Sequence, residues 1–89
     1  ISFYTFNETE EAMALANATS YGLGASIWSK DIMQAKQIAN NIESGMIYIN
    51  QIVKSDARFP FGGIKKSGFG RELGEFGLRE FCNVKTIWV

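Results

Sequence analysis

One residue in this chain, Cys82, carries a thiol that could attack a carbonyl carbon. The chain contains no histidine, so Ser-His and Cys-His nucleophile pairs are excluded, as are zinc sites built on histidine or on several cysteines. Cys82 lies near the end of a predicted helix, where the helix dipole disfavours a thiolate. We therefore expect Cys82 to be a buried, structural cysteine.

Two glycine-rich stretches match phosphate-binding loops only in part. Residues 68–74 (Gly-Phe-Gly-Arg-Glu-Leu-Gly) have Leu73 where the dinucleotide-binding fingerprint needs its third glycine, and they follow a long loop rather than a strand. Residues 62–67 (Gly-Gly-Ile-Lys-Lys-Ser) have no glycine directly before either lysine, as a P-loop requires. Both stretches are therefore expected to form tight turns, and no cofactor-binding residue is assigned to them.

The segment from Gln51 to Arg71 is the part of the chain in which we expect function. About 20 residues without regular structure are uncommon in a compact domain unless they have a role. The segment has five basic residues against the single acid Asp56, so it could attract an anion, although such loops are usually only solvated. Phe59 and Phe61 flank a proline and could line an apolar pocket or equally serve as core anchors.

Apolar periodicity predicts the elements that position this segment. The pattern predicts three strands separated by two helices, a β-α-β-α-β order typical of part of a parallel sheet in an α/β protein. The first helix is expected to start at Asn7, with Glu10 as its capping-box partner. The three strands are expected at Ile1–Phe6, Leu23–Trp28 and Met46–Ile49, and the second helix at Asp31–Ile42.

Two further elements are expected after the long loop. A helix is predicted over Glu72–Cys82, weakened by its two glycines, and a final strand over Val84–Val89. No later element is available to cover that strand, and an exposed apolar edge favours association with another chain.

Composition excludes several classes of partner. The chain has 89 residues, is 46% hydrophobic and carries no net charge, so it is one small domain at most and lacks the positive charge that generic nucleic-acid or membrane binding needs. It has no apolar run of about 20 residues and no possible internal disulfide, which fits a reducing, cytoplasmic compartment. Its small size, and its start at Ile1 without an initiator methionine, lead us to expect a piece of a longer protein.

The motifs together resemble the C-terminal stretch of the aldehyde dehydrogenase superfamily. The resemblance covers essentially the whole chain, and within the superfamily it is greatest to succinate-semialdehyde dehydrogenases. The stretches that carry it are Glu10-Glu11-Ala12, Tyr21-Gly22-Leu23, Gly45-Met46-Ile47-Tyr48-Ile49-Asn50, residues 54–58 (Lys-Ser-Asp-Ala-Arg), the long segment Pro60–Glu72, Gly77-Leu78 and residues 81–86 (Phe-Cys-Asn-Val-Lys-Thr).

The resemblance implies oxidation of an aldehyde to a carboxylate with NAD or NADP as cofactor. In that family a cysteine thiolate attacks the aldehyde and a glutamate activates the hydrolytic water. Both groups belong to family motifs that are not found in this chain, and Cys82 matches neither. We therefore expect no catalytic residue, no cofactor-binding residue and no metal ligand among these residues, and we expect the isolated chain to be inactive.

Three substrate-binding residues are expected. The resemblance implies that the ring of Phe61 lines the aldehyde pocket and that Ser55 offers its hydroxyl to the distal carboxylate of a semialdehyde. The type and place of Arg58 suggest that it adds charge attraction for that carboxylate. The chain is expected to divide into residues 1–82, part of a catalytic domain, and residues 83–89, an oligomerisation strand.

The expected partners are an aldehyde substrate, the rest of the parent chain and further copies in a homo-dimer or homo-tetramer, with no nucleic acid and no membrane. Two alternatives remain open. One is a non-catalytic anion-binding or assembly module. The other is another branch of the superfamily that acts on betaine, lactaldehyde or aromatic aldehydes.

Overall fold

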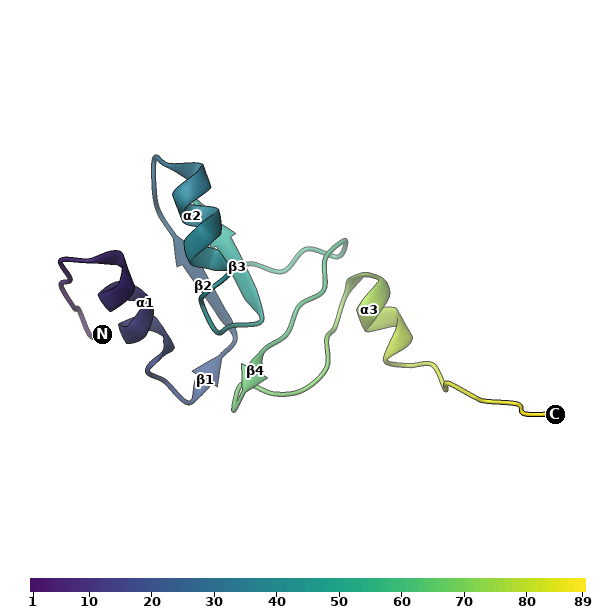
Figure 1. The fold of residues 1–89 in the computed structure, drawn as a ribbon. Coiled ribbons are helices and arrows are strands. Elements are labelled where there is room, and N and C mark those ends of the chain that lie inside the picture. Colours follow the sequence, from purple (N-terminus) through teal and green to yellow (C-terminus); the bar gives the residue numbers. More distant parts are fainter.

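A computed structural model describes all 89 residues of the chain, which form three short helices and four short strands (Figure 1). The fold is α/β, with a parallel strand pair and an antiparallel strand pair. In chain order the elements are α1 (Thr9–Asn17), β1 (Tyr21–Gly22), β2 (Gly24–Ile27), α2 (Ile32–Ala39), β3 (Met46–Ile49), β4 (Ile64–Lys65) and α3 (Gly74–Arg79).

The β2-α2-β3 unit is the best-packed part of the molecule. Strands β2 and β3 are parallel, with Gly24 opposite Met46 and Ile27 opposite Ile49. Asp31 caps α2, because its Oδ1 accepts a hydrogen bond from the Gln34 N–H at 2.9 Å. The predicted Met46–Ile49 strand and the parallel arrangement are confirmed.

Strand β4 forms inside the stretch that the sequence pattern assigned to a loop. It pairs antiparallel with β1, with Tyr21 opposite Lys65 and Gly22 opposite Ile64. Two residues are too few to give a periodic hydrophobic signal, which is why the pattern does not reveal this strand.

Helix α1 begins one residue later than predicted, because the N-cap position is Glu8 rather than Asn7. Glu8 occupies the N-cap position without a side-chain cap, and Thr9 is the first helical residue. The carboxylate of Glu11, rather than that of Glu10, reaches back to accept from the Asn7 N–H at 3.1 Å. The expected capping box between Asn7 and Glu10 is therefore wrong.

Helix α3 is shorter than the predicted Glu72–Cys82 helix. Leu73 and Gly74 both have positive φ values, 63° and 61°, and this left-handed backbone prevents regular helix before Gly74. The helix ends at Arg79 after six residues.

Neither predicted terminal strand forms in this structure. Residues 1–6 and 84–89 are extended and unpaired, and Figure 1 shows the C-terminal stretch leading away from the rest of the chain. A β-strand requires a neighbouring strand to accept and donate its backbone hydrogen bonds, and no other segment of the chain lies in that position. The apolar side chains of both stretches are exposed: Ile1, Phe3, Tyr4, Phe6, Val84, Ile87, Trp88 and Val89.

The molecule as a whole lacks a closed core. Five of its 89 residues are buried, and Ala35 and Met46 are the apolar ones among them. Its radius of gyration is 16.2 Å, compared with about 12 Å for a compact domain of this length. None of the helices combines the length and apolarity of a membrane span. The strands and helices therefore expose most of the apolar surface that a complete domain would bury.

Candidate functional site

Phe61 lies in an extended segment that a second segment holds by backbone hydrogen bonds. The Phe61 N–H donates to the Glu72 carbonyl at 2.7 Å, and the Glu72 N–H donates to the Phe61 carbonyl at 2.8 Å, so the two residues form an antiparallel bridge. The Phe61 side chain is half-buried. The ring is therefore fixed relative to residues 70–73 rather than carried on a free loop.

A cavity of about 280 Å³ lies beside Phe61. Glycine backbone and polar groups form much of its wall, so it is not a closed apolar site. Neither Ser55 nor Arg58 lines it, and the chain therefore does not bring the three predicted substrate-binding residues into one cavity. The lining residues are Leu23, Phe61, Gly62, Gly63, Ser67, Phe69, Gly70, Arg71 and Glu72.

The backbone that follows Phe61 packs directly on the start of β3. A Cβ added to Gly45 would overlap the Gly62 carbonyl oxygen and would lie 2.8 Å from the Gly62 carbonyl carbon. The Gly45 N–H donates to the Gly22 carbonyl at 3.0 Å. Only glycine at position 45 allows β1, β3 and the Gly62–Gly63 backbone to approach this closely.

Arg71 bonds backbone carbonyls within the glycine turn. Its Nη1 donates to the carbonyls of Gly63 and Gly70 at 2.9 and 2.7 Å. Glu80 Oε1 accepts from the Arg71 N–H at 3.3 Å, so a carboxylate already occupies the turn. A second anion at this position would be repelled, which agrees with a turn rather than a cofactor-phosphate loop.

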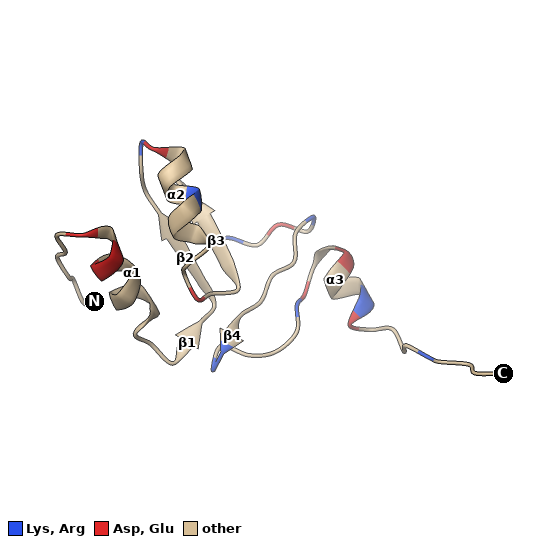
Figure 2. Cartoon of the chain, viewed as in Figure 1, with Lys and Arg blue, Asp and Glu red and all other residues tan.

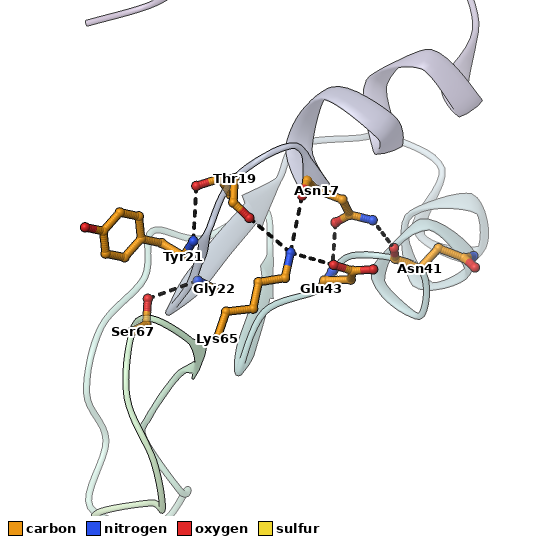
Figure 3. Close-up of polar contacts among 8 residues, drawn as sticks. All are labelled: Asn17, Thr19, Tyr21, Gly22, Asn41, Glu43, Lys65 and Ser67. Atoms are coloured by element: carbon orange, nitrogen blue, oxygen red, sulfur yellow. Dashed lines mark hydrogen bonds and ion pairs between the residues drawn. The ribbon is translucent and has the colours of Figure 1, made fainter.

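Lys65 joins three separate segments (Figure 3). Its Nζ donates to the carbonyls of Asn17 and Thr19 at 3.2 and 3.3 Å and forms an ion pair with Glu43 at 2.5 Å. The side chain is only 26% exposed. Because Asn17 ends α1, the positive charge also lies at the negative end of that helix.

Side chains around Lys65 complete this polar cluster. The Asn17 amide bonds the Asn41 carbonyl and the Glu43 N–H, each at 2.8 Å, and the Ser67 hydroxyl accepts from the Gly22 N–H at 3.0 Å (Figure 3). The cluster therefore connects α1, the α2–β3 turn and β4. We refer to Asn17, Thr19, Glu43, Lys65 and Ser67 as the Lys65 cluster.

Ser55 and Arg58 lie on the loop between β3 and β4, which carries both basic and acidic residues (Figure 2). The Ser55 side chain is exposed and makes no hydrogen bond. The Arg58 guanidinium makes two contacts with Asp56: Nε to Oδ1 at 2.9 Å and Nη2 to Oδ2 at 2.7 Å. Hydrogen bonds from the side chain and backbone of Arg58 hold the pKa of Asp56 well below its usual value, and the Asp56 hydrogen bond raises the pKa of Arg58.

Cys82 is exposed, so the expectation that it is buried is wrong. It follows the short helix α3, beyond which the chain has nothing to pack against it. Its Sγ lies 3.7 Å from the Leu78 carbonyl and makes no contact with a cationic side chain or a base. The structure therefore offers no group that would activate this thiol as a nucleophile.

Asp56 and Lys65 have contacts that the sequence reasoning did not assign. The Asp-x-Arg spacing was a usable signal, since an aspartate side chain commonly accepts from the backbone N–H two residues later. The Lys65 contacts span 46 and 48 positions in the chain, and no local pattern reveals such pairs.

Nearly the whole chain matches known proteins of one family. The model of the "Aldehyde dehydrogenase family" matches residues 1–87. The succinate-semialdehyde dehydrogenase [NADP(+)] 1 of Mycobacterium ulcerans is 48% identical over 88 residues, which are 99% of this chain and 19% of the relative.

Two solved structures are similar in fold. The succinic semialdehyde dehydrogenase of Streptococcus pyogenes, in complex with NADP+, superposes with a TM-score of 0.88 at 45% identity, over 94% of this chain and 18% of that one. The betaine aldehyde dehydrogenase of Staphylococcus aureus, in complex with NAD+, has a TM-score of 0.82 at 45% identity, over 85% and 15%. Sequence and fold therefore agree that the chain belongs to the aldehyde dehydrogenase family.

Proposed function

We propose that these 89 residues form the C-terminal part of an NAD(P)+-dependent aldehyde dehydrogenase that oxidises a semialdehyde, with succinic semialdehyde as the preferred substrate. The observation that carries the proposal is the family match over residues 1–87 together with 48% identity to a succinate-semialdehyde dehydrogenase. The chain spans 19% of that relative's length, so most of the enzyme, including its nucleophile and cofactor site, would lie in other residues.

Within that enzyme, we assign substrate binding to three residues. The half-buried ring of Phe61 would form part of the aldehyde pocket. The unbonded hydroxyl of Ser55 is free to donate to the distal carboxylate. Arg58 uses two of its five N–H donors on Asp56 and keeps three for a second carboxylate.

The glycine turn at residues 68–70 is poorly suited to the pyrophosphate of a nicotinamide cofactor. The turn at Gly68–Gly70 is next to the Glu80 carboxylate and the internally bonded Arg71, and an anionic pyrophosphate would be repelled there. NAD or NADP, which accepts a hydride in such enzymes, would be held by residues outside this chain. These 89 residues would contribute side chains to the aldehyde pocket.

We further propose that residues 1–82 belong to the catalytic domain and that residues 83–89 form an oligomerisation strand in a homo-dimer or homo-tetramer. Residues 84–89 make no backbone hydrogen bond within the chain, and their apolar side chains are exposed. Such an unpaired segment is suited to join a sheet edge.

The test is aldehyde-dependent formation of NADH or NADPH, followed by absorbance, with succinic semialdehyde as substrate. The full-length protein should reduce the cofactor in a substrate-dependent way, and the isolated 89-residue chain should give no rate above background. The proposal fails if the full-length protein oxidises no aldehyde, or if the isolated chain alone supports the reaction.

A second candidate is oxidation of another aldehyde, and it is favoured by the similarity to betaine aldehyde dehydrogenase at 45% identity. Rates with betaine aldehyde under the same conditions decide between the two substrate classes. The positive charge of Arg58 would attract the anionic semialdehyde and repel the cationic betaine aldehyde. We do not favour the anion-binding module, since Lys65 and Arg71 already bond carbonyls or a carboxylate within the chain.

A further inference from the structure

The loop that carries Ser55 and Arg58 is fixed to its surroundings at both ends. On one side the Tyr48 hydroxyl donates to the Lys54 carbonyl at 2.5 Å, which connects the loop to β3. On the other side the Gly74 N–H donates to the Ala57 carbonyl at 3.1 Å, which connects it to the start of α3. Ser55 and Asp56 lie between these two points and Arg58 follows directly after them, so the local conformation depends on contacts within residues 55–59.

Asp56 makes most of those internal contacts. Its Oδ1 accepts from the Arg58 backbone N–H at 3.0 Å and from Arg58 Nε at 2.9 Å, and its Oδ2 accepts from Arg58 Nη2 at 2.7 Å. Its carbonyl accepts from the Phe59 N–H at 3.0 Å. A planar guanidinium bound at two points by one carboxylate has a single orientation, unlike a solvated arginine with several rotamers.

The remaining edge of Arg58 is available to a ligand. The Arg58 side chain is 78% exposed despite its two contacts with Asp56, and its guanidinium lies over the Phe59 ring, 5.4 Å from the ring centroid. Ring and carboxylate together restrict the guanidinium from two directions. The three N–H groups that remain are therefore presented in a fixed orientation, three positions after Ser55, the other residue assigned to the substrate carboxylate.

From this arrangement we propose that Asp56 is a positioning residue: it orients Arg58 for the carboxylate of the substrate and so contributes to the preference for carboxylate-bearing over neutral aldehydes. The inference rests on the proposed function, because it requires that the enzyme oxidise a semialdehyde. An opposing effect also exists, since the Asp56 charge itself repels an anionic substrate. The proposal states that orientation of Arg58 outweighs that repulsion.

The Asp56→Asn variant of the full-length enzyme removes the ion pair with Arg58 but keeps the backbone turn at Asp56. The asparagine oxygen can still accept from the Arg58 backbone N–H, so the turn is retained, while the negative charge and the second acceptor oxygen are lost. We expect KM for succinic semialdehyde to rise about three- to fivefold, the upper end of the scale for an exposed charge contact. The kcat value, and both constants for butanal, should change less than about twofold.

The Arg58→Gln variant and the double variant complete the experiment. If Asp56 acts through Arg58, then Asp56→Asn adds nothing to KM in the Arg58→Gln background. The Asp56→Glu variant, which keeps the charge, should recover part of the preference for succinic semialdehyde. Apparent melting temperatures of all variants show whether any change reflects lost folding.

The possible results distinguish the two proposals. A wild-type enzyme that oxidises butanal as well as succinic semialdehyde overturns the proposed function. If the wild type prefers succinic semialdehyde but Asp56→Asn lowers KM for it or leaves it unchanged, the positioning role alone is overturned. The same holds if Asp56→Asn raises that KM equally in the wild-type and Arg58→Gln backgrounds. A rise confined to succinic semialdehyde and dependent on Arg58 supports it.

Discussion

Among the three proposed substrate-binding residues, Phe61 is the one whose truncation should weaken aldehyde binding most. Phe61→Ala in the full-length enzyme removes a half-buried ring from a backbone that stays bonded to Glu72. We expect kcat/KM for succinic semialdehyde to fall about tenfold, mainly through KM, because apolar contact to the aldehyde chain is lost. Steady-state rates over a range of substrate concentrations measure this.

Phe61→Leu is the matched comparison, because it keeps apolar volume and loses only the ring. It should fall between the wild type and Phe61→Ala in kcat/KM. If both variants have wild-type kinetics, Phe61 is not part of the aldehyde pocket, and the resemblance-based assignment of this residue is wrong.

The contacts of the candidate site residues were harder to predict than their identity. Phe61 and Ser55 were named because family motifs mark their positions, and Arg58 was named from its type and place; their role in substrate binding stays a prediction. The same reasoning left Arg58 as a free charge, whereas Asp56 holds it at 2.7 and 2.9 Å. It also expected a buried Cys82, which is exposed because the residues after α3 lead away from the helix and do not pack on it (Figure 1).

At the scale of elements, the Lys65 cluster joins α1, the α2–β3 turn and β4. Lys65→Met keeps the apolar stem and leaves the Glu43 carboxylate and two carbonyls without their cation. Hydrogen bonds to a charged group contribute about 1.5–3 kcal/mol each at most, and the partly exposed site lowers that, so we expect about 1–3 kcal/mol of lost stability in total. The apparent melting temperature of the full-length enzyme should fall by several degrees.

Lys66→Met provides the control, because the exposed Lys66 side chain makes no hydrogen bond. Its melting temperature should stay close to that of the wild type, since surface substitutions usually change stability by less than about 0.5 kcal/mol. Equal melting temperatures for the two variants would show that the Lys65 contacts do not stabilise the enzyme.

The close approach of β3 and the Phe61 segment gives a second prediction for the elements. Gly45→Ala would place a methyl group on the Gly62 carbonyl and force the Gly62–Gly63 backbone away. Overpacking of this kind costs about 1–3 kcal/mol, and here it should also raise KM for the aldehyde because Phe61 precedes the displaced backbone. Thermal melting and steady-state kinetics measure the two effects.

Gly24→Ala is the matched control for Gly45→Ala. It adds the same methyl group at a position where the nearest atoms belong to a side chain, which can move more easily than backbone. The added Cβ would lie 3.1 Å from a Val53 methyl group, which can shift by a few tenths of an ångström. It should therefore be the milder of the two variants in both measurements. A Gly45→Ala enzyme as stable and as active as Gly24→Ala would contradict the packing described for the Phe61 segment.

Elements that depend on local residues were predictable, and those that depend on distant ones were not. The Met46–Ile49 strand and the second helix follow from local apolar patterns, so the sequence indicates both correctly, although the helix occupies Ile32–Ala39 rather than Asp31–Ile42. Strand β4 exists because β1 lies beside it. The predicted strands at 1–6 and 84–89 have strand-like composition but no neighbour within these residues.

At the scale of the whole molecule, the isolated chain should not fold as a stable domain. It has 36 backbone–backbone hydrogen bonds, compared with roughly 60 for a compact domain of this length, and two buried apolar residues form its core. Circular dichroism of the isolated 89 residues should show gradual, non-cooperative melting, and amide proton resonances should be poorly dispersed. A sharp melting transition with dispersed resonances from a monomer would contradict this.

The central proposal is that these 89 residues supply pocket-lining and carboxylate-binding side chains to a larger aldehyde dehydrogenase, whose reacting groups lie in other residues. The measurement that tests this most directly is the ratio of kcat/KM for succinic semialdehyde to kcat/KM for butanal, obtained with the full-length enzyme. We predict a ratio of at least about ten, because only the semialdehyde presents a carboxylate to Ser55 and Arg58. A ratio of one or less would contradict the account.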